Sequence, residues 1–203
     1  MKRVLFVALL ALALPMAVFA DSSTDFSSGG GTLSGLSGGL TLSGSELFHV
    51  SGLDGLGTVT GALGSVSLST GALLSSVLNA NGSLNLATFA SGGSLTIVGN
   101  GTDGIPSGVI FSGTFTGSPK LEQVGSGYIL AGSFTGTLSN GTRESGTLAL
   151  VTEGAGGKGY LGQIGVGSVD ISMSSPVPEP GTLTLLGTGL VGLAGVIRRK
   201  LAA

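Results

Sequence analysis

Apolar and polar residues alternate most clearly between residues 105 and 173. Apolar side chains occupy one side of the extended chain at Val109, Phe111, Phe115, Tyr128, Leu130, Phe134 and Leu138. Small or hydroxyl side chains occupy the other side at Ser112, Thr114, Thr116, Ala131, Ser133, Thr135 and Thr137. A period of two residues is that of a half-buried strand, so the pattern predicts β-strands in this part of the chain.

A repeat and a turn signal indicate how these strands connect. The segment Gly113–Ser118 returns 19 residues later, in similar form, as Gly132–Thr137, a spacing that fits strand, turn and strand. Asn140-Gly141 supplies the positive φ of a tight turn and predicts a hairpin into a strand at 147–151. Residues 160–166 and 168–173 are predicted as two final strands.

The first half of the chain, residues 32–104, is made of short Leu, Val and Thr segments separated by Gly and Ser. Strands are predicted at 66–68, 84–86 and 94–98, with turns at Asn81-Gly82 and Asn100-Gly101. Residues 72–78 are interpreted as a helical turn, and residues 21–31 as a flexible lead-in.

Even strand spacing with Gly-rich turns predicts an all-β fold, an antiparallel Gly/Ser/Thr-rich β-sandwich or barrel. The alternative for residues 32–104 is a parallel β-solenoid, in which Gly and Ser fill tight corners, although the segment has no fixed repeat period. Disorder of this half is a third reading, which its low charge and many leucines disfavour.

The first 20 residues have the pattern of a secretory signal peptide. Lys2-Arg3 precedes an apolar run, and Val18-Phe19-Ala20 forms a small-residue cleavage site before Asp21. The alternative is a retained membrane anchor, but the apolar run is short for a span. We therefore expect a signal helix at 1–20 and an exported domain at 21–175.

Residues 176–203 form a distinct tail. Val177, Pro178, Glu179 and Pro180 precede 17 uncharged residues at 181–197, and Arg198, Arg199 and Lys200 follow. A helix of that length spans about 26 Å, the lower end of what crosses a bilayer. The tail predicts a transmembrane helix at 181–197 with its basic end in the cytoplasm, the alternative being a buried helix of a globular domain.

This tail resembles the PEP-CTERM sorting tail of Gram-negative bacteria, which is also labelled the ice-binding protein C-terminal domain. The Val-Pro-Glu-Pro segment at 177–180 falls on the family's motif, and residues 198–200 fall on its basic end. The resemblance implies cleavage near the motif by a membrane-embedded sorting enzyme, an exosortase. It also implies export linked to exopolysaccharide or the cell surface, with the chain as a substrate of catalysis.

Composition excludes several classes of function. Charged residues make up 9% of the chain, and there are no cysteines, so disulfides, thiolate nucleophiles and Cys-ligated metals are excluded. Between the two basic ends lie only Lys120, Arg143 and Lys158, together with all ten acidic residues. The exported part is therefore mildly acidic, and we expect no nucleic-acid partner.

Candidate catalytic residues are few. His49 is the only histidine, so a Ser-His-Asp triad would have to use it, with Asp54 or Asp103 as its acid. Residues 35–39 spell the nucleophile elbow G-x-S-x-G around Ser37, but the strand before it and the helix after it are missing from the pattern. His49 is better interpreted as a surface residue on a strand edge.

Paired carboxylates for glycoside hydrolysis are a further possibility, at Glu122, Glu144 and Glu153. The aromatic platforms that usually accompany sugar cleavage are scarce, and no Asp/Asn spacing matches a calcium loop. We therefore predict a non-enzymatic protein with no catalytic residues, no metal site and no cofactor.

The remaining candidate site is a row of threonines at Thr114, Thr116, Thr135 and Thr137. If their strands pair in register, they form a flat hydroxyl array suited to ordered water, ice or polysaccharide. The plainer interpretation is a solvent-facing strand, where Thr is favoured anyway. The main hypothesis is a surface or extracellular-matrix component of structural or adhesive type. An ice- or polysaccharide-binding module is the alternative, and a hydrolase centred on His49 is the third.

We expect the secretion machinery, the exosortase-type enzyme and the inner membrane as partners, with exopolysaccharide as a further candidate. The protein is then anchored in the inner membrane through its C-terminal helix before it is sorted to the surface or matrix.

Overall fold

The computed structural model describes residues 23–154 and 162–175. The strands are β1 (Ser23–Gly29), β2 (Thr32–Leu36), β3 (Gly39–Ser51), β4 (Val59–Ser69), β5 (Leu73–Leu78), β6 (Leu84–Phe89), β7 (Gly92–Asn100), β8 (Ser107–Phe115), β9 (Lys120–Val124), β10 (Gly127–Leu138), β11 (Arg143–Thr152) and β12 (Ile164–Ser174). A short 3-10 turn at Leu53–Gly55 is the only helical element in these ranges. None of the helical structure there has the length and apolar character needed to cross a membrane. The helices predicted at 1–20 and 181–197 lie outside the described residues.

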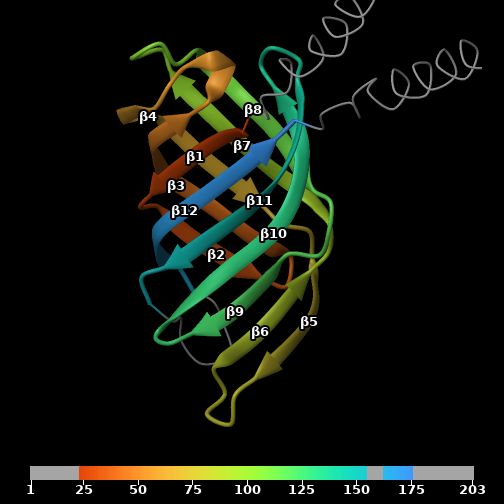
Figure 1. The fold of residues 1–203 in the computed structure, drawn as a ribbon. Coiled ribbons are helices and arrows are strands. Elements are labelled where there is room, and N and C mark those ends of the chain that lie inside the picture. Colours follow the sequence, from red (N-terminus) through yellow and green to blue (C-terminus); the bar gives the residue numbers. More distant parts are fainter. Residues whose placement is uncertain (1–22, 155–161, 176–203) are drawn as a thin grey trace, which may run out of the picture. The chain divides into compact units, whose positions relative to one another are not determined.

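The strands form a sheet that closes on itself (Figure 1). Going around it, the order is β1, β3, β4, β7, β8, β10, β11 and β12, and β12 pairs again with β1. At the closing seam Ser23 lies opposite Ser174 and Gly29 opposite Ser168. Every neighbouring pair is antiparallel. The predicted sandwich or barrel is thus a closed antiparallel sheet with a filled interior.

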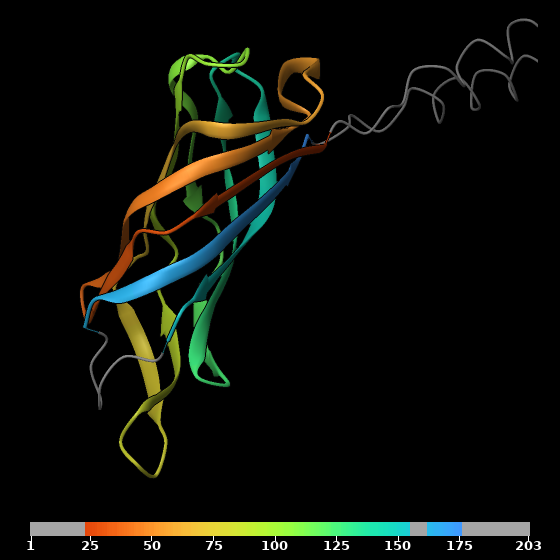
Figure 2. The same ribbon diagram turned by 90° about the vertical axis from the view of Figure 1, so that its left-hand side faces the viewer.

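The remaining strands, β2, β5, β6 and β9, lengthen the ring that the closed sheet forms. Thr32 of β2 faces Gly165 of β12, which continues the register of the β1–β12 pair past Gly30 and Gly31. In the same way the β5–β6 pair continues the β4–β7 pair, and the β6–β9 pair continues the β7–β8 pair. Strands β5 and β6 and the turn between them, residues 73–89, form the β5–β6 hairpin, which extends beyond the ring at one end (Figure 2).

The interior of the closed sheet is filled by aliphatic and aromatic side chains. The rings of Phe111 and Phe134 meet edge to face with centroids 5.5 Å apart. Glycines provide the room for these rings, because a Cβ at Gly113 would lie 2.8 Å from Cζ of Phe111. Packing of aromatic rings over inward-facing glycines explains part of the Gly content of the strands.

Residues 21–31 were predicted to be a flexible lead-in, and from Ser23 onward this is wrong. Ser23–Gly29 forms β1, which closes the sheet between β12 and β3. Phe26 is buried in the core, and the buried hydroxyl of Ser45 donates a hydrogen bond to that of Ser28 (2.9 Å). The alternation of buried and less buried side chains along residues 23–29, rather than their Gly/Ser-rich composition, indicates a strand.

Two other predictions for the first half are also wrong. The parallel solenoid proposed for 32–104 is excluded, since each pairing of β2 to β7 is antiparallel. The helical turn predicted at 72–78 is strand β5, paired with β6. No cap favours a helix there, and Asn81-Gly82 turns the chain back into a hairpin instead, with a positive φ at Gly82.

The alternation predicted around Val109 is interrupted by a β-bulge. Val98 pairs with Val109 and Ile97 with Phe111, so Ile110 is the extra residue. Both Ile110 and Phe111 are buried, and Val109 is exposed, contrary to the prediction. A bulge shifts the pleat by one residue, which a period-two pattern does not reveal.

The strands near the end of the domain are close to those predicted. The hairpin at Asn140-Gly141 is confirmed, with Thr137 opposite Arg143. The two final strands are one strand, β12, which begins at Ile164. Residues 155–161, with Tyr160, lie outside the described ranges.

Candidate functional site

Thr114 lies on the outer side of β8, and Thr135 and Thr137 lie on the outer side of the neighbouring strand β10. Thr116 directly follows β8 and is also exposed. Thr114 lies directly opposite Thr135. Thr137 lies opposite Ser112, and Thr116 donates its backbone N–H to Ser133 O (3.0 Å). Because the strands are antiparallel, Thr116 and Thr137 lie at opposite ends of the array.

Each cross-strand row of hydroxyl side chains continues from β10 onto β11 and β12. Thr135 faces Ser145 of β11, which faces Ser174 of β12. Ser133 faces Thr147, which faces Ser172. All of these residues are exposed, and together they form the hydroxyl face: Ser112, Thr114, Thr116, Ser133, Thr135, Thr137, Ser145, Thr147, Ser172 and Ser174. Rows follow one another about 7 Å apart along each strand, and strands are about 4.8 Å apart.

Hydrogen bonds within the hydroxyl face orient part of it. The Thr135 hydroxyl donates to the backbone carbonyl oxygen of Glu144 (3.1 Å), and the Ser145 hydroxyl donates to Oγ1 of Thr135 (3.4 Å). Hydroxyl groups both donate and accept, so the face offers neutral, paired hydrogen-bonding sites beside methyl groups. Such a surface is chemically suited to hydroxyl-rich ligands or ordered water.

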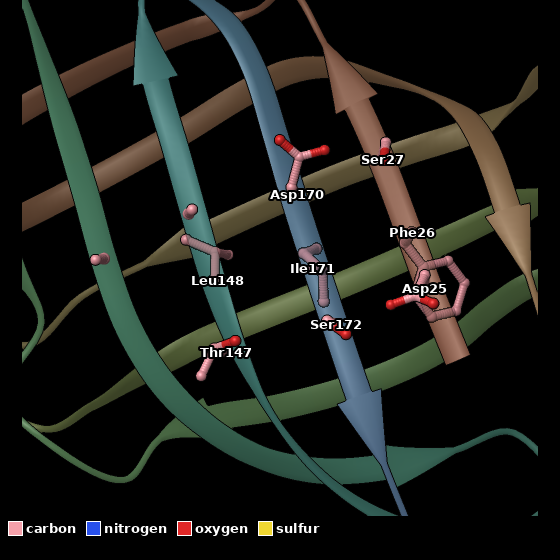
Figure 3. A pocket seen from close by; sticks show the side chains of 10 residues that line it. Asp25, Phe26, Ser27, Thr147, Leu148, Asp170, Ile171 and Ser172 are labelled. Atoms are coloured by element: carbon pink, nitrogen blue, oxygen red, sulfur yellow. The ribbon is translucent and has the colours of Figure 1, made fainter. Parts of the chain in front are cut away.

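A shallow depression of about 440 Å³ lies on β1, β12, β11 and β10 and includes Thr147 and Ser172 of the hydroxyl face (Figure 3). Its floor is low where Ala131 lies opposite Ala149, because both side chains are single methyl groups. Asp25 and Asp170 lie at its β1–β12 side, where Asp170 pairs with Ser27. A second depression of about 330 Å³ shares Ala131 with the first and reaches Lys120.

These depressions bring carboxylates to one side of the outer surface and an ammonium group to the other. Two carboxylates alone do not form a cation site, and no cluster of three or more metal-ligating side chains occurs among the described residues. The side chains that line these depressions offer hydrogen-bonding groups and opposite charges at their two sides. The sequence reading missed Asp25 and Asp170, although the alternation at 24–28 would have placed Asp25 on an outer face.

The strand–turn–helix elbow expected around Ser37 for a Ser-His-Asp triad is not formed. Ser37 lies in the tight turn between β2 and β3, and a strand rather than a helix follows it. His49 is half-buried on β3, opposite Ser27 on one side and Thr60 on the other. Since β3 is paired on both sides, His49 is not on a sheet edge either.

One of the three candidate glutamates is buried, and the other two are exposed. Glu122 and Glu153 are exposed, whereas Glu144 is only 2% exposed. Oε1 of Glu144 accepts a hydrogen bond from the Ser175 hydroxyl (2.8 Å), and its Oε2 has no partner among the described residues. Burial therefore separates Glu144 from the two exposed carboxylates.

The predicted sorting residues Val177, Pro178, Glu179 and Pro180 and the basic residues Arg198, Arg199 and Lys200 lie outside the described residues. Comparison with known families nevertheless identifies this part of the chain. Residues 176–200 match the PEP-CTERM protein-sorting motif. The match confirms the resemblance drawn from the sequence, and it covers about an eighth of the chain.

A PEP-CTERM motif implies an exported protein that an exosortase-type enzyme recognises and processes. The motif identifies how the chain is handled and leaves the closed sheet unassigned. No curated protein and no solved structure matches the chain.

Proposed function

We propose that this protein is a non-enzymatic component of the cell surface or extracellular matrix, of structural or adhesive type. The sorting motif at 176–200 is the observation that carries the proposal. A closed sheet with a filled interior and a mildly acidic exterior that carries the hydroxyl face supports it, since such a domain presents an extended surface rather than an enclosed reaction site.

The proposed route uses both ends of the chain. The secretion machinery exports the protein through the signal peptide at 1–20. The span at 181–197 then holds it in the inner membrane, with Arg198, Arg199 and Lys200 in the cytoplasm. An exosortase-type enzyme cuts near residues 177–180 and releases the domain toward the surface or matrix, with exopolysaccharide as a candidate partner.

Deletion of residues 177–203 tests this route. The truncated protein should leave the membrane fraction of the native host, whereas the full chain with residues 177–180 replaced by alanines should remain there uncut. Intact mass should show a mature species that starts at Asp21 and ends near Pro178. A truncated protein that stays membrane-bound would overturn the proposal.

A second candidate function is binding of ice or polysaccharide by the hydroxyl face. The register that places Thr114 opposite Thr135 and continues to Ser145 favours it. Replacing Thr114 and Thr135 by Tyr should abolish pull-down by the host's exopolysaccharide, or shaping of ice crystals, and leave the fold intact. The matched control is Thr60→Tyr, an exposed threonine on β4 outside the face. Equal binding by all three proteins would contradict this function.

A further inference from the structure

The last strand of the sheet ends directly before the sorting motif. Strand β12 ends at Ser174, which is paired with β1 on one side and with β11 on the other. The sorting motif begins at residue 176, so Ser175 alone lies between the two. Pro178 is four residues beyond Ser174, and four residues of fully extended chain span at most about 14 Å. The expected cleavage position therefore follows a firmly paired strand after a very short connection.

Ser175 is held to the sheet by a side chain of β11. Oε1 of Glu144 accepts a hydrogen bond from the Ser175 hydroxyl (2.8 Å). Glu144 directly precedes Ser145, the residue that pairs with Ser174, so it lies beside the end of β12. Its backbone carbonyl oxygen accepts a hydrogen bond from the Thr135 hydroxyl of β10 (3.1 Å). Glu144 thus extends the attachment of the chain by one residue beyond the strand ladder.

The stability of the closed sheet does not explain a carboxyl group at this position. Glu144 is 2% exposed and is the only buried acidic residue in the ranges that the structure describes. Its Oε2 is buried there without a hydrogen-bond partner, which costs free energy because water can no longer solvate this atom. A leucine would fill a similar volume without that cost. The carboxyl group is better explained by the contact that it makes with Ser175.

A contact at this point controls access to the sorting motif. A protease acts on a segment of a folded protein after the segment has opened locally. When opening and closing are faster than cleavage, the rate of cleavage follows the fraction of molecules in which the segment is open. A hydrogen bond of typical net strength changes such a fraction by about three- to tenfold.

We propose that Glu144 is a positioning residue for the processing of the sorting motif. Its hydrogen bond with Ser175 holds the chain on the closed sheet up to the residue before the motif, and the exosortase-type enzyme takes up the motif when this contact opens. The inference rests on the proposed route, in which that enzyme cuts near residues 177–180. Folding and processing are then coupled, because the contact requires β11 and β12 to be paired.

Pulse-chase labelling of the full chain in its native host measures the rate of conversion to the cut species. Ser175→Ala removes the hydrogen-bond donor and should raise this rate about three- to tenfold. Glu144→Leu removes the acceptor and should raise the rate similarly, while the domain stays at least as stable as in the wild type. Glu144→Gln keeps a carbonyl oxygen for the Ser175 hydroxyl, so its rate should stay close to that of the wild type.

Further variants separate this role from a general loss of stability. Ser139→Ala, at an exposed serine of the β10–β11 turn at the same end of the sheet, should leave the rate unchanged. The double variant E144L/S175A should be cut no faster than either single variant, because both changes remove the same contact. Denaturant unfolding of each full-length variant shows whether faster cleavage accompanies a less stable domain.

The outcomes distinguish this inference from the proposed route. If the wild type is cut and the Ser175→Ala and Glu144→Leu proteins are cut at the same rate as it is, the route stands and the role of Glu144 is overturned. Rates that rise only in proportion to a loss of domain stability would overturn that role as well. If the wild type is not cut, the route itself fails, and this inference fails with it.

Discussion

The β8–β10 pair and the β5–β6 hairpin are both antiparallel strand pairs but have different neighbours. Strand β8 is flanked by β7 and β10, and β10 by β8 and β11. Phe134 of β10 faces the filled interior and is 1% exposed. Strand β5 has β6 alone beside it, and Val77 is 51% exposed. Inward-facing aromatic residues such as Phe134 stabilise the chain by burial, whereas the exposed apolar residues of β5 contribute little to its stability.

Substitution of a core aromatic residue should give the largest effect. Phe134→Ala removes a buried ring and its edge-to-face contact with Phe111, and should lower the free energy of unfolding by about 3–5 kcal/mol. Leu78→Ala in the hairpin should cost about 0.5 kcal/mol, since Leu78 is 53% exposed. Denaturant unfolding followed by circular dichroism measures both, because the chain has no Trp. Equal losses would contradict the contrast between the two regions.

A glycine of β10 should give the next largest effect. A Cβ at Gly136 would clash with the ring of Phe111 and with Ser112 O, and would lie 2.6 Å from Cα of Gly113. Gly136→Ala should therefore cost about 1–3 kcal/mol by overpacking. Gly117→Ala is the matched control, because nothing lies within 4 Å of a Cβ there. A neutral Gly136→Ala variant would show that β8 and β10 are less closely packed than the structure indicates.

The parts of the fold that could be predicted from sequence depend on local signals. Asn140-Gly141 and the alternation at 128–138 predicted the β10–β11 hairpin, because turn geometry and pleat are set within a few residues. The closing pair of β1 with β12 was missed, since it joins residues far apart in the chain and its register has no local signature. The bulge at Ile110 was missed for a similar reason, because the insertion is defined by the partner strand β7.

For the candidate site, the sequence identified residues that are chemically suitable, but it did not show how far the hydroxyl face extends across the sheet. The threonine pair Thr114 and Thr135 was predicted conditionally, and the observed register places them opposite each other. The extension through Ser145 to Ser174 depends on the order of β10, β11 and β12 around the sheet. The sorting motif, by contrast, is defined by a short stretch of sequence. The motif at 176–200 could therefore be identified without knowledge of the protein's fold.

Tyr128 connects the two regions and should give a moderate effect. Its hydroxyl donates to Leu84 O of β6 (3.1 Å), and burial raises the pKa of its phenol above the ordinary 10.0. Tyr128→Phe leaves the buried carbonyl without its partner and should cost about 1–2 kcal/mol at neutral pH.

The same residue predicts a pH dependence. Above pH 10 the unfolded phenol ionises while the folded one stays neutral, so wild-type stability is complete below pH 10 and falls as pH rises through the raised pKa. The Tyr128→Phe variant should lose this part of the alkaline decline, whereas Tyr160→Phe, the change at the other tyrosine, should retain it. Identical pH profiles for wild type and Tyr128→Phe would refute the assignment to Tyr128.

The smallest effect on stability is expected at exposed valines of the two regions. Val77 of β5 and Val109 of β8 are 51% and 53% exposed, so a lysine at either position should change the free energy of unfolding by less than about 0.5 kcal/mol. Denaturant unfolding followed by circular dichroism measures both changes against the wild type. The two regions therefore differ in their inward-facing residues and not in their exposed ones. If Val109→Lys destabilises the protein strongly while Val77→Lys does not, the outer side of β8 also contributes to packing, and the contrast between the two regions extends to both faces of the sheet.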